Sequence, residues 1–224
     1  LVKTEHGPVT TTRTMDPVGN VLTSTDGEGK TTVYTYTAAN QVKTVTNPAS
    51  ETTTYEYDAV GRRTRVTFAN SSFRAYTYNQ AGELTQTSGG PEGATAYAYD
   101  DLGRQIRVTD ANGRDRRTFY DALGRVVQVE NEMGQPVIYT YDKAGRRRTL
   151  TDAEGNTTSY TYDKDSRLVL MRYPGGEAER YRYDGGGLLI RKRTPNGDRI
   201  RYSYNAAGAL ASVRFGGNTV TYTR

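Results

Sequence analysis

The chain has 224 residues, of which 34% are hydrophobic, and its mean hydropathy is -0.78, so it holds little material for a compact core. It contains no cysteine, which excludes disulfide bonds, thiolate metal sites and a cysteine nucleophile. The net charge of +5 would suit an acidic partner, but Lys and Arg mix with Asp and Glu along the whole chain, which favours a solvated face with structural arginines. The 19 tyrosines and the many Val and Thr residues are typical of β-structure and not of disorder.

The N-terminal segment starts Leu1-Val2-Lys3-Thr4, without Met and without the apolar stretch of a signal peptide. The longest apolar runs, such as residues 168–171, are too short to span a bilayer. We therefore expect a piece of a longer protein, with no signal peptide in this fragment and no membrane span. His6 is the single histidine, and no nucleophile is distinctively placed near it, so a Ser-His-Asp triad is not expected.

A 21-residue repeat runs along the chain in about ten copies, marked by tyrosines two residues apart. The two tyrosine columns hold 17 of the 19 tyrosines, which makes the register strict. The second column comprises Tyr36, Tyr57, Tyr78, Tyr99, Tyr120, Tyr141, Tyr162, Tyr183 and Tyr204. The first column comprises Tyr34, Tyr55, Tyr76, Tyr97, Tyr139, Tyr160, Tyr181 and Tyr202. Arg13, Met15 and Thr118 are exceptions in these slots.

The residues after each second tyrosine are those of a tight turn. Asp or Asn comes next in most copies, as at Asp58 and Asp142, and Gly follows three residues later, as at Gly61 and Gly145. Asp and Asn side chains bond nearby backbone N–H groups and Gly tolerates positive φ, so this spacing predicts a loop. A second glycine column, which includes Gly113, lies half a repeat away, so turns should alternate every ten or eleven residues.

The segments between the turns have the alternation and the β-branched or aromatic residues of strands, as in residues 125–129 and 137–141. Each repeat is therefore predicted to be one β-hairpin. Two apolar columns, two and five places after the turn glycine, have opposite parity, as at Val42 and Val45. A bulge, or a turn that extends past the Arg, would reconcile the two columns.

These elements predict an all-β fold, an array of about ten 21-residue β-hairpin repeats. About twenty strands at roughly 4.8 Å spacing would make a ribbon about 100 Å long, and open twisted sheets of more than about ten strands are rare. We therefore expect a coiled, shell-like sheet. By the repeat phase Leu1 falls inside a hairpin and Arg224 stops where the next unit would form, so the array 1–224 is expected to be a fragment with partial repeats at both ends.

The core of the repeat combines both signals in eight residues. It occurs as Tyr55-Glu56-Tyr57-Asp58-Ala59-Val60-Gly61-Arg62, as Tyr97-Ala98-Tyr99-Asp100-Asp101-Leu102-Gly103-Arg104 and as Tyr139-Thr140-Tyr141-Asp142-Lys143-Ala144-Gly145-Arg146. This core closely resembles the YD repeat of the rearrangement-hotspot (Rhs) family, and the resemblance covers essentially the whole chain. Departures occur at residues 37–40, at Thr118, and at Glu83, Leu188 and Ala209 in the Arg slot.

The resemblance implies a hollow shell of coiled hairpins, as in bacterial polymorphic toxins, type VI secretion effectors, the shells of insecticidal toxin complexes and the animal teneurins. Teneurins are the weaker match because they are disulfide-bearing receptors. In the bacterial toxins the shell encloses a C-terminal toxic domain. The implied function is thus a structural, non-enzymatic segment of the shell of a secreted bacterial toxin, whose toxic domain this chain lacks. The implied partners are the rest of the shell, the enclosed toxin domain and a secretion apparatus, without a cofactor.

Other chemistry has weaker support in the sequence. Asp163 and Asp165 could suggest a paired-carboxylate or calcium site, but Asp recurs at each turn, where backbone capping explains it. The glycines at 185–187 lack the Gly-Lys-Ser/Thr of a phosphate loop. The interleaved Tyr and Arg columns leave open an adhesion module for glycans or other polyanions. Nucleic-acid binding is not expected, because the tyrosines share a face with the aliphatic columns and should be packed.

Overall fold

The structure is a computed structural model, and it describes residues 11–222. All regular elements in this range are β-strands, and the chain forms two compact units, which divide after Asp115. Unit 1 contains β1 (Thr12–Met15), β2 (Val21–Thr25), β3 (Thr31–Tyr36), β4 (Val42–Thr46), β5 (Thr52–Tyr57), β6 (Arg63–Thr67), β7 (Phe73–Tyr78), β8 (Leu84–Ser88), β9 (Thr95–Tyr99) and β10 (Gln105–Thr109).

Unit 2 has the same organisation. It contains β11 (Asp115–Tyr120, of which Asp115 is the last residue of unit 1), β12 (Val126–Glu130), β13 (Pro136–Tyr141), β14 (Arg147–Thr151), β15 (Thr157–Tyr162), β16 (Leu168–Arg172), β17 (Ala178–Tyr183), β18 (Leu189–Arg193), β19 (Arg199–Tyr204), β20 (Leu210–Phe215) and β21 (Asn218–Thr221). The all-β hairpin array predicted from the sequence is confirmed.

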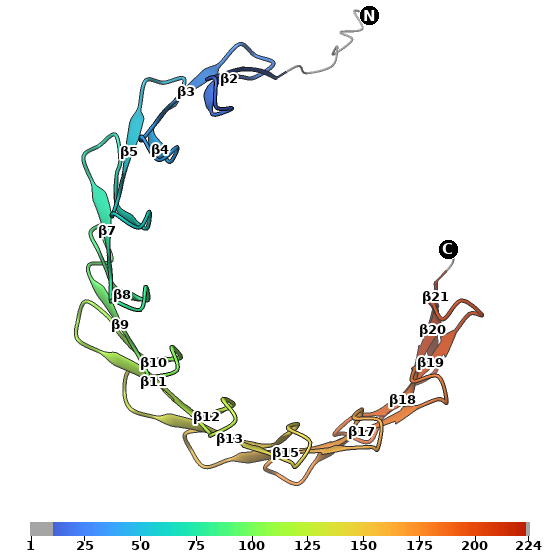
Figure 1. Cartoon of the computed structure of the whole chain (residues 1–224). Helices are drawn as coiled ribbons and strands as arrows, with labels where there is room; N and C mark the ends of the chain where they lie inside the picture. Colours follow the sequence, from blue (N-terminus) through green and yellow to red (C-terminus); the bar gives the residue numbers. More distant parts are fainter. Residues whose placement is uncertain (1–10, 223–224) are drawn as a thin grey trace, which may run out of the picture. The chain divides into compact units, whose positions relative to one another are not determined.

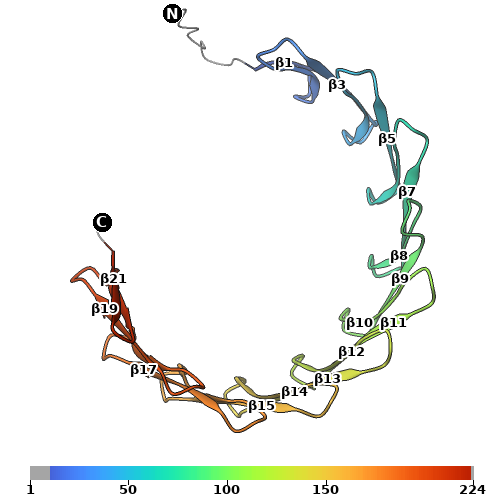
Figure 2. The ribbon, with the colours of Figure 1, turned by 180° about the vertical axis from the view of Figure 1, so that it is seen from behind.

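Within each unit every strand pairs with its neighbours in sequence, and every pair is antiparallel. In unit 1 the ladder runs from β1 to β10, and in unit 2 it runs from β11 to β21. Within each unit the strands form a single ribbon that bends gradually from hairpin to hairpin (Figure 1), and in the described residues no second layer of strands lies over either face of the ribbon (Figure 2). Each hairpin inside a unit therefore contacts only the hairpins before and after it, as in other repeat arrays.

A β-bulge explains the two apolar columns. In the pair of β3 and β4, Thr35 lies opposite Thr44, whereas Tyr36 lies opposite Val42, so Lys43 is the extra residue. Tyr34 lies opposite Val45. The extra residue brings both valines to the tyrosine face, as the bulge hypothesis predicts. The same register shift occurs next to the second tyrosine in the other strand pairs that are joined by the loop after that tyrosine.

The one-layer sheet has almost no buried interior. Among the described residues only Val66, which is 6% exposed, and Glu179, which is 8% exposed, are buried. On the face opposite the tyrosines, threonine hydroxyls pair across strands, as Thr35 with Thr44 at 2.6 Å and Thr140 with Thr149 at 2.6 Å. Cross-strand pairs and hydrogen bonds therefore stabilise the ribbon in place of a central core. No helix in residues 11–222 is long and apolar enough to cross a membrane.

Candidate functional site

The loop that follows each second tyrosine is built from backbone and carboxylate hydrogen bonds. In the loop at Asp58, the Asp58 N–H donates to the Arg62 carbonyl at 2.9 Å and the Gly61 N–H donates to the Asp58 carbonyl at 3.0 Å. Asp58 Oδ1 also accepts the N–H groups of Val60 and Arg62, at 3.1 and 2.9 Å. Gly61 has φ of 87°, a left-handed conformation that glycine adopts without strain. The turn prediction is confirmed here, with Asp as the loop's internal acceptor.

The arginine at the end of this loop connects one repeat to the next. Arg62 Nε donates to Asp58 Oδ2 at 2.7 Å, and Arg62 Nη1 donates to the Asn79 carbonyl at 3.3 Å. Its guanidinium carbon lies 4.8 Å from the ring centroid of Tyr78, within the range of a cation–π contact. We call this group, the Asp and Arg of one repeat and the second Tyr of the following repeat, a clasp.

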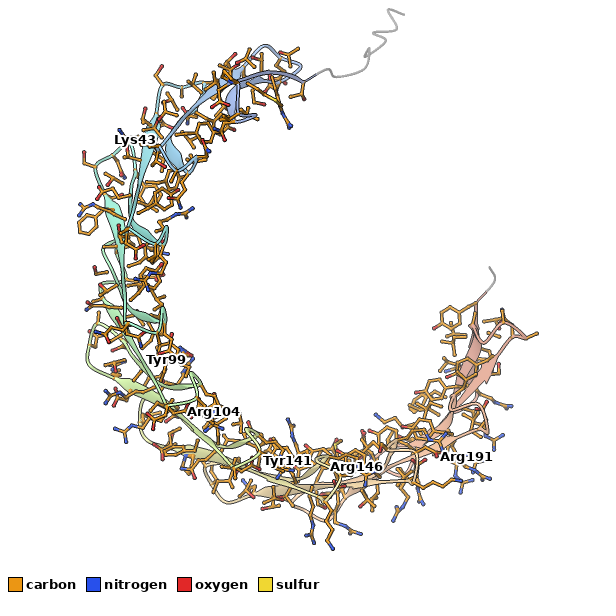
Figure 3. The ribbon with its side chains drawn as sticks, in the orientation of Figure 1. Lys43, Tyr99, Arg104, Tyr141, Arg146 and Arg191 are labelled. Carbon is orange, nitrogen blue, oxygen red and sulfur yellow. The ribbon has the colours of Figure 1, made fainter. Side chains whose placement is uncertain are left out.

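The clasp recurs in unit 2. Arg146 Nε donates to Asp142 Oδ2 at 2.8 Å and its Nη1 donates to the Asp163 carbonyl at 3.0 Å. The guanidinium lies 4.8 Å from the ring centroid of Tyr162. Arg125 and Tyr141 form the same contact at 4.6 Å. Figure 3 labels Arg104, Tyr141 and Arg146 along the ribbon.

The hydroxyl of the second tyrosine makes a further link between repeats. Tyr57 Oη donates to the Val42 carbonyl at 2.8 Å and Tyr141 Oη donates to the Val126 carbonyl at 2.6 Å, in each case 15 residues back. The equivalent bonds join Tyr36 to Val21, Tyr78 to Arg63, Tyr99 to Leu84, Tyr183 to Leu168 and Tyr204 to Leu189. These seven second tyrosines are therefore tied to the preceding repeat by the hydroxyl, and three of them, Tyr78, Tyr141 and Tyr183, also by the ring.

The structure divides the predicted repeat core between two contacts. In the first copy Asp58, Gly61 and Arg62 lie together in one loop, whereas Tyr57 contacts the preceding repeat through Val42. In the second copy Arg104 donates to Asp100 at 2.7 Å, Gly103 has φ of 75°, Tyr99 bonds Leu84 and Tyr97 lies opposite Val108. In the third copy Gly145 has φ of 80°, Arg146 bonds Asp142 and Tyr141 bonds Val126.

The first tyrosines have a different environment. Tyr55 and Tyr139 lie under the guanidinium groups of Arg63 and Arg147, with ring centroids 4.8 and 5.0 Å away. These arginines belong to the returning strand of the same hairpin, so the first tyrosine packs within its own repeat. The sequence pattern does not separate these two environments directly, although the stricter 21-residue recurrence of the second tyrosine is a signal for its inter-repeat role.

Copies that depart from the repeat core keep the loop by other means. Asn40 replaces the turn glycine with φ of 59°, and Thr37 Oγ1 replaces the Asp carboxylate by accepting the Gln41 N–H at 3.2 Å. Gln41 Nε2 then reaches the next repeat and donates to the Gly61 carbonyl at 2.8 Å. At Glu83 the acid accepts a hydrogen bond from the Asn79 side chain at 2.6 Å. Asn and Ser can occupy the left-handed region at a cost, which explains why the loop survives these changes.

Hydrogen bonding in the clasps sets the charge state of the aspartates. The Arg104 side chain holds the pKa of the Asp100 carboxyl below its ordinary value, and Arg146 does the same for Asp142. Conversely, burial raises the pKa of the Tyr183 hydroxyl. The clasps are therefore formed by ionised aspartates and neutral tyrosines at neutral pH.

An ion pair that sequence analysis missed replaces aliphatic packing between β17 and β18. Lys192 occupies the slot of the aliphatic column opposite Tyr181, and its Nζ lies 2.9 Å from Glu179 Oε1. The Tyr181 hydroxyl donates to the other carboxylate oxygen of Glu179. Burial and this hydrogen bond raise the pKa of the Tyr181 hydroxyl. Burial alone would raise the pKa of the Glu179 carboxyl, but its bonds to Tyr181 and Lys192 outweigh burial, so the pKa of Glu179 is lowered. The sequence signal for this ion pair is Lys192, which stands where most other repeats have an aliphatic residue.

The two acids considered for a calcium or paired-carboxylate site, Asp163 and Asp165, lie against an arginine. In residues 11–222 no group of three or more His, Asp, Glu or Cys side chains is placed to hold a metal ion. Asp163 lies 2.7 Å from Arg167, and the same arginine lies 2.8 Å from Asp165, so both carboxylates pair with one cation. His6 lies outside the described residues.

Comparison with known proteins places this repeat in a family. A family model described as teneurin YD-shell matches residues 2–177 and 116–223, which together cover nearly the whole chain. The chain belongs to the YD-shell family. The Rhs/YD-repeat resemblance found in the sequence is thereby confirmed. No curated protein matches it.

Solved structures show the same fold for the YD-shell chain. A crystal structure of TcdB2-TccC3-TEV matches with a TM-score of 0.70 at 16% identity, over 92% of this chain and 13% of that one. The Tc holotoxin pore of Photorhabdus luminescens, with the TccC3 mutation D651A, matches with a TM-score of 0.52 at 16% identity, over 92% of this chain and 14% of that one. This YD-shell chain thus spans a small part of the length of the structures it matches.

Proposed function

We propose that this chain is a structural segment of the encapsulating β-shell of a secreted bacterial Rhs-type toxin, whose shell encloses a C-terminal toxic domain. The observation that carries the proposal is the match of the hairpin array to the TcdB2-TccC3 structure over 92% of the chain, together with the YD-shell family. The partners would be the rest of the shell, the enclosed toxic domain and the apparatus that delivers the protein.

The clasps supply the mechanical property that a wall needs. Where both contacts are present, as at Tyr141, the second tyrosine is held by the preceding repeat at its hydroxyl and at its ring, so these neighbouring hairpins cannot separate without breaking both contacts. Stability in such arrays is a sum of repeat and interface contributions. A wall of this kind would keep its cargo away from solvent until delivery without any chemical step.

The repeat core supports containment and not catalysis. Its aspartates accept hydrogen bonds from their own loop and arginine, as Asp142 does from the N–H groups of Ala144 and Arg146 and from the Arg146 side chain. The column of arginines considered for glycan or polyanion adhesion is engaged in the same way, since Arg62 and Arg146 each contact an Asp, a carbonyl and a ring. The adhesion hypothesis therefore gains no support from this column.

Limited proteolysis of the full-length protein that contains this chain tests the proposal. The C-terminal region should resist protease in the native protein and become sensitive when the clasps are opened by Arg62→Ala, Arg146→Ala and Arg167→Ala together. The matched control replaces Arg13, Arg74 and Arg148 by Ala; these exposed arginines lie outside the clasps, and the control should retain protection. A C-terminal region that is cleaved freely in the native protein would contradict encapsulation.

A further inference from the structure

The face of the ribbon opposite the tyrosines carries a concentration of arginine in its last strands. Cross-strand partners on this face are Arg182 with Arg191, Arg180 with Arg193, Arg191 with Arg201, Arg193 with Arg199, and Arg201 with Arg214. We call this group of seven arginines from β17 to β20 the arginine face. All seven side chains are exposed. Arg191, labelled in Figure 3, has partners on both neighbouring strands.

The arginine face lacks compensating acid. Within residues 11–222 none of its arginines forms an ion pair with Asp or Glu. Asp198 lies at its margin, and its carboxylate accepts a hydrogen bond from Thr194 at 3.5 Å. Glu179 and Lys192, on the same strands, pair with each other at the tyrosine face.

Other repeats fill the same positions without like charges. The rung equivalent to Arg182 and Arg191 holds Thr35 with Thr44 in unit 1 and Thr140 with Thr149 in unit 2. In the hairpin of β5 and β6 that rung holds Glu56 opposite Arg65, which are of opposite charge. Because like charges directly opposite each other destabilise a sheet, the arginine face is a cost to the fold that the repeat itself does not require.

The spacing of the arginine face fits an extended chain of carboxylates. Arginines of adjacent strands are about 4.8 Å apart, and arginines two residues apart on one strand are about 6.7 Å apart. Side chains on one side of an extended peptide have that same period of about 6.7 Å. Two arginines from adjacent strands can therefore bind one carboxylate of an extended peptide. The next pair of arginines along the same two strands can bind the carboxylate two residues further along that peptide.

Residue type also favours carboxylate recognition. The arginine face contains no lysine, and the planar guanidinium suits two-point contact with a carboxylate. Two shallow hollows of about 270 and 380 Å³ lie against it, each lined by six residues. Arg193 lines the smaller hollow, Arg214 lines the larger one and Arg199 lines both. Tyr181 borders the smaller hollow, but its ring lies under Lys192 on the opposite face, and Tyr202 lies opposite Val213 on that face, so bases would find no stacking platform here.

We propose that the arginine face binds an extended acidic polypeptide segment with Asp or Glu at alternate positions. The proposal depends on β17 to β20 alone and holds whether or not the chain belongs to a toxin shell. The occupant would lie along the strands, with its carboxylates between paired arginines and its other side chains directed to solvent.

Fluorescence anisotropy with the 224-residue chain tests this proposal. The probe is a labelled peptide of six Glu-Thr dipeptides, compared with a peptide of six Glu followed by six Thr, which has equal charge. We expect the alternating peptide to bind at least fivefold more tightly. The variant Arg182→Gln, Arg191→Gln, Arg201→Gln, Arg214→Gln should lose at least tenfold in affinity, and the four Arg→Lys changes should lose part of it.

A charge-matched control separates this surface from the net charge of the protein. Changing Arg13, Arg74, Arg148 and Lys43 to neutral Gln removes the same charge from exposed positions outside the arginine face, and should alter affinity by less than twofold. Circular dichroism melts establish that each variant is folded, and removal of the opposed arginines should raise the melting temperature. Equal binding of the two peptides, an equal loss in the control, or tighter binding of a heparin fragment or an oligonucleotide of the same charge would overturn the proposal.

Discussion

The hydroxyl of Tyr141 provides a defined test of the links between repeats. Tyr141→Phe removes the hydrogen bond to the Val126 carbonyl, whose O···O distance is 2.6 Å, and leaves the ring contact with Arg125 in place. One hydrogen bond of this kind contributes about 0.5–1.5 kcal/mol net. This loss corresponds to an about 2- to 13-fold increase in the opening equilibrium of the hairpin contact.

Tyr139→Phe is the matched control, because it makes the same chemical change two residues away in β13. Among the described residues the Tyr139 hydroxyl has no hydrogen-bond partner, and its ring packs under Arg147 at 5.0 Å. We expect this variant to change the opening free energy by less than about 0.5 kcal/mol, the usual range for a surface substitution.

Hydrogen–deuterium exchange measured by mass spectrometry is the suitable assay, because long repeat arrays need not unfold in one step. Exchange in Tyr141→Phe should accelerate about 2- to 13-fold in peptides covering β12 and β13 and remain unchanged in distant repeats. Equal effects of the two substitutions, or acceleration spread evenly over the chain, would refute the assignment of this hydroxyl to the junction between repeats.

Further predictions concern the loops, the buried ion pair and pH. Ser50→Gly should stabilise the protein by about 1 kcal/mol in urea unfolding, since Ser50 has φ of 62°. Gly155→Ala should destabilise it by about as much, because Gly155 has φ of 85°. Gly185→Ala should be nearly neutral, because Gly185 is outside the left-handed region and has open space around it. Lys192→Met should destabilise toward the lower end of roughly 3–5 kcal/mol, because it leaves the buried Glu179 carboxylate without a cation and with the Tyr181 hydroxyl as its remaining side-chain partner; an unchanged unfolding midpoint would contradict this. The clasp aspartates and Glu179 have lowered pKa values, so their stabilisation is complete above about pH 5 and disappears as pH falls through their folded values. Half-buried tyrosines have raised pKa values, so stability should also decline above about pH 10; thermal melts from pH 2 to 11 check both limits.

The fold could be predicted from the sequence because the chain repeats every 21 residues. The turn residues Asp58 and Gly61 and the strand alternation at 137–141 are local signals. Because the same signals recur at a fixed period in about ten copies, the prediction of a hairpin array is much stronger than one copy would allow. Even the bulge could be anticipated, because Val42 and Val45 cannot share a face in a regular strand.

Contacts between repeats were less accessible from sequence, because they depend on how one hairpin lies against the next. Nothing local in Tyr141 specifies that its hydroxyl reaches a carbonyl 15 residues back, or that its ring lies under Arg125 and not under an arginine of its own repeat. The arginine face was also missed, since Arg182, Arg191 and Arg201 lie on three successive strands and only the strand register, which the bulges shift, shows that they are directly opposite one another.

The central claim, that this hairpin ribbon is part of an enclosing wall, is tested most directly by a cryo-electron microscopy map of the full-length protein. The account predicts that the YD-repeat ribbon lines a closed internal volume with density for a further polypeptide inside it. A ribbon exposed to solvent on both faces, with no enclosed volume, would contradict the account.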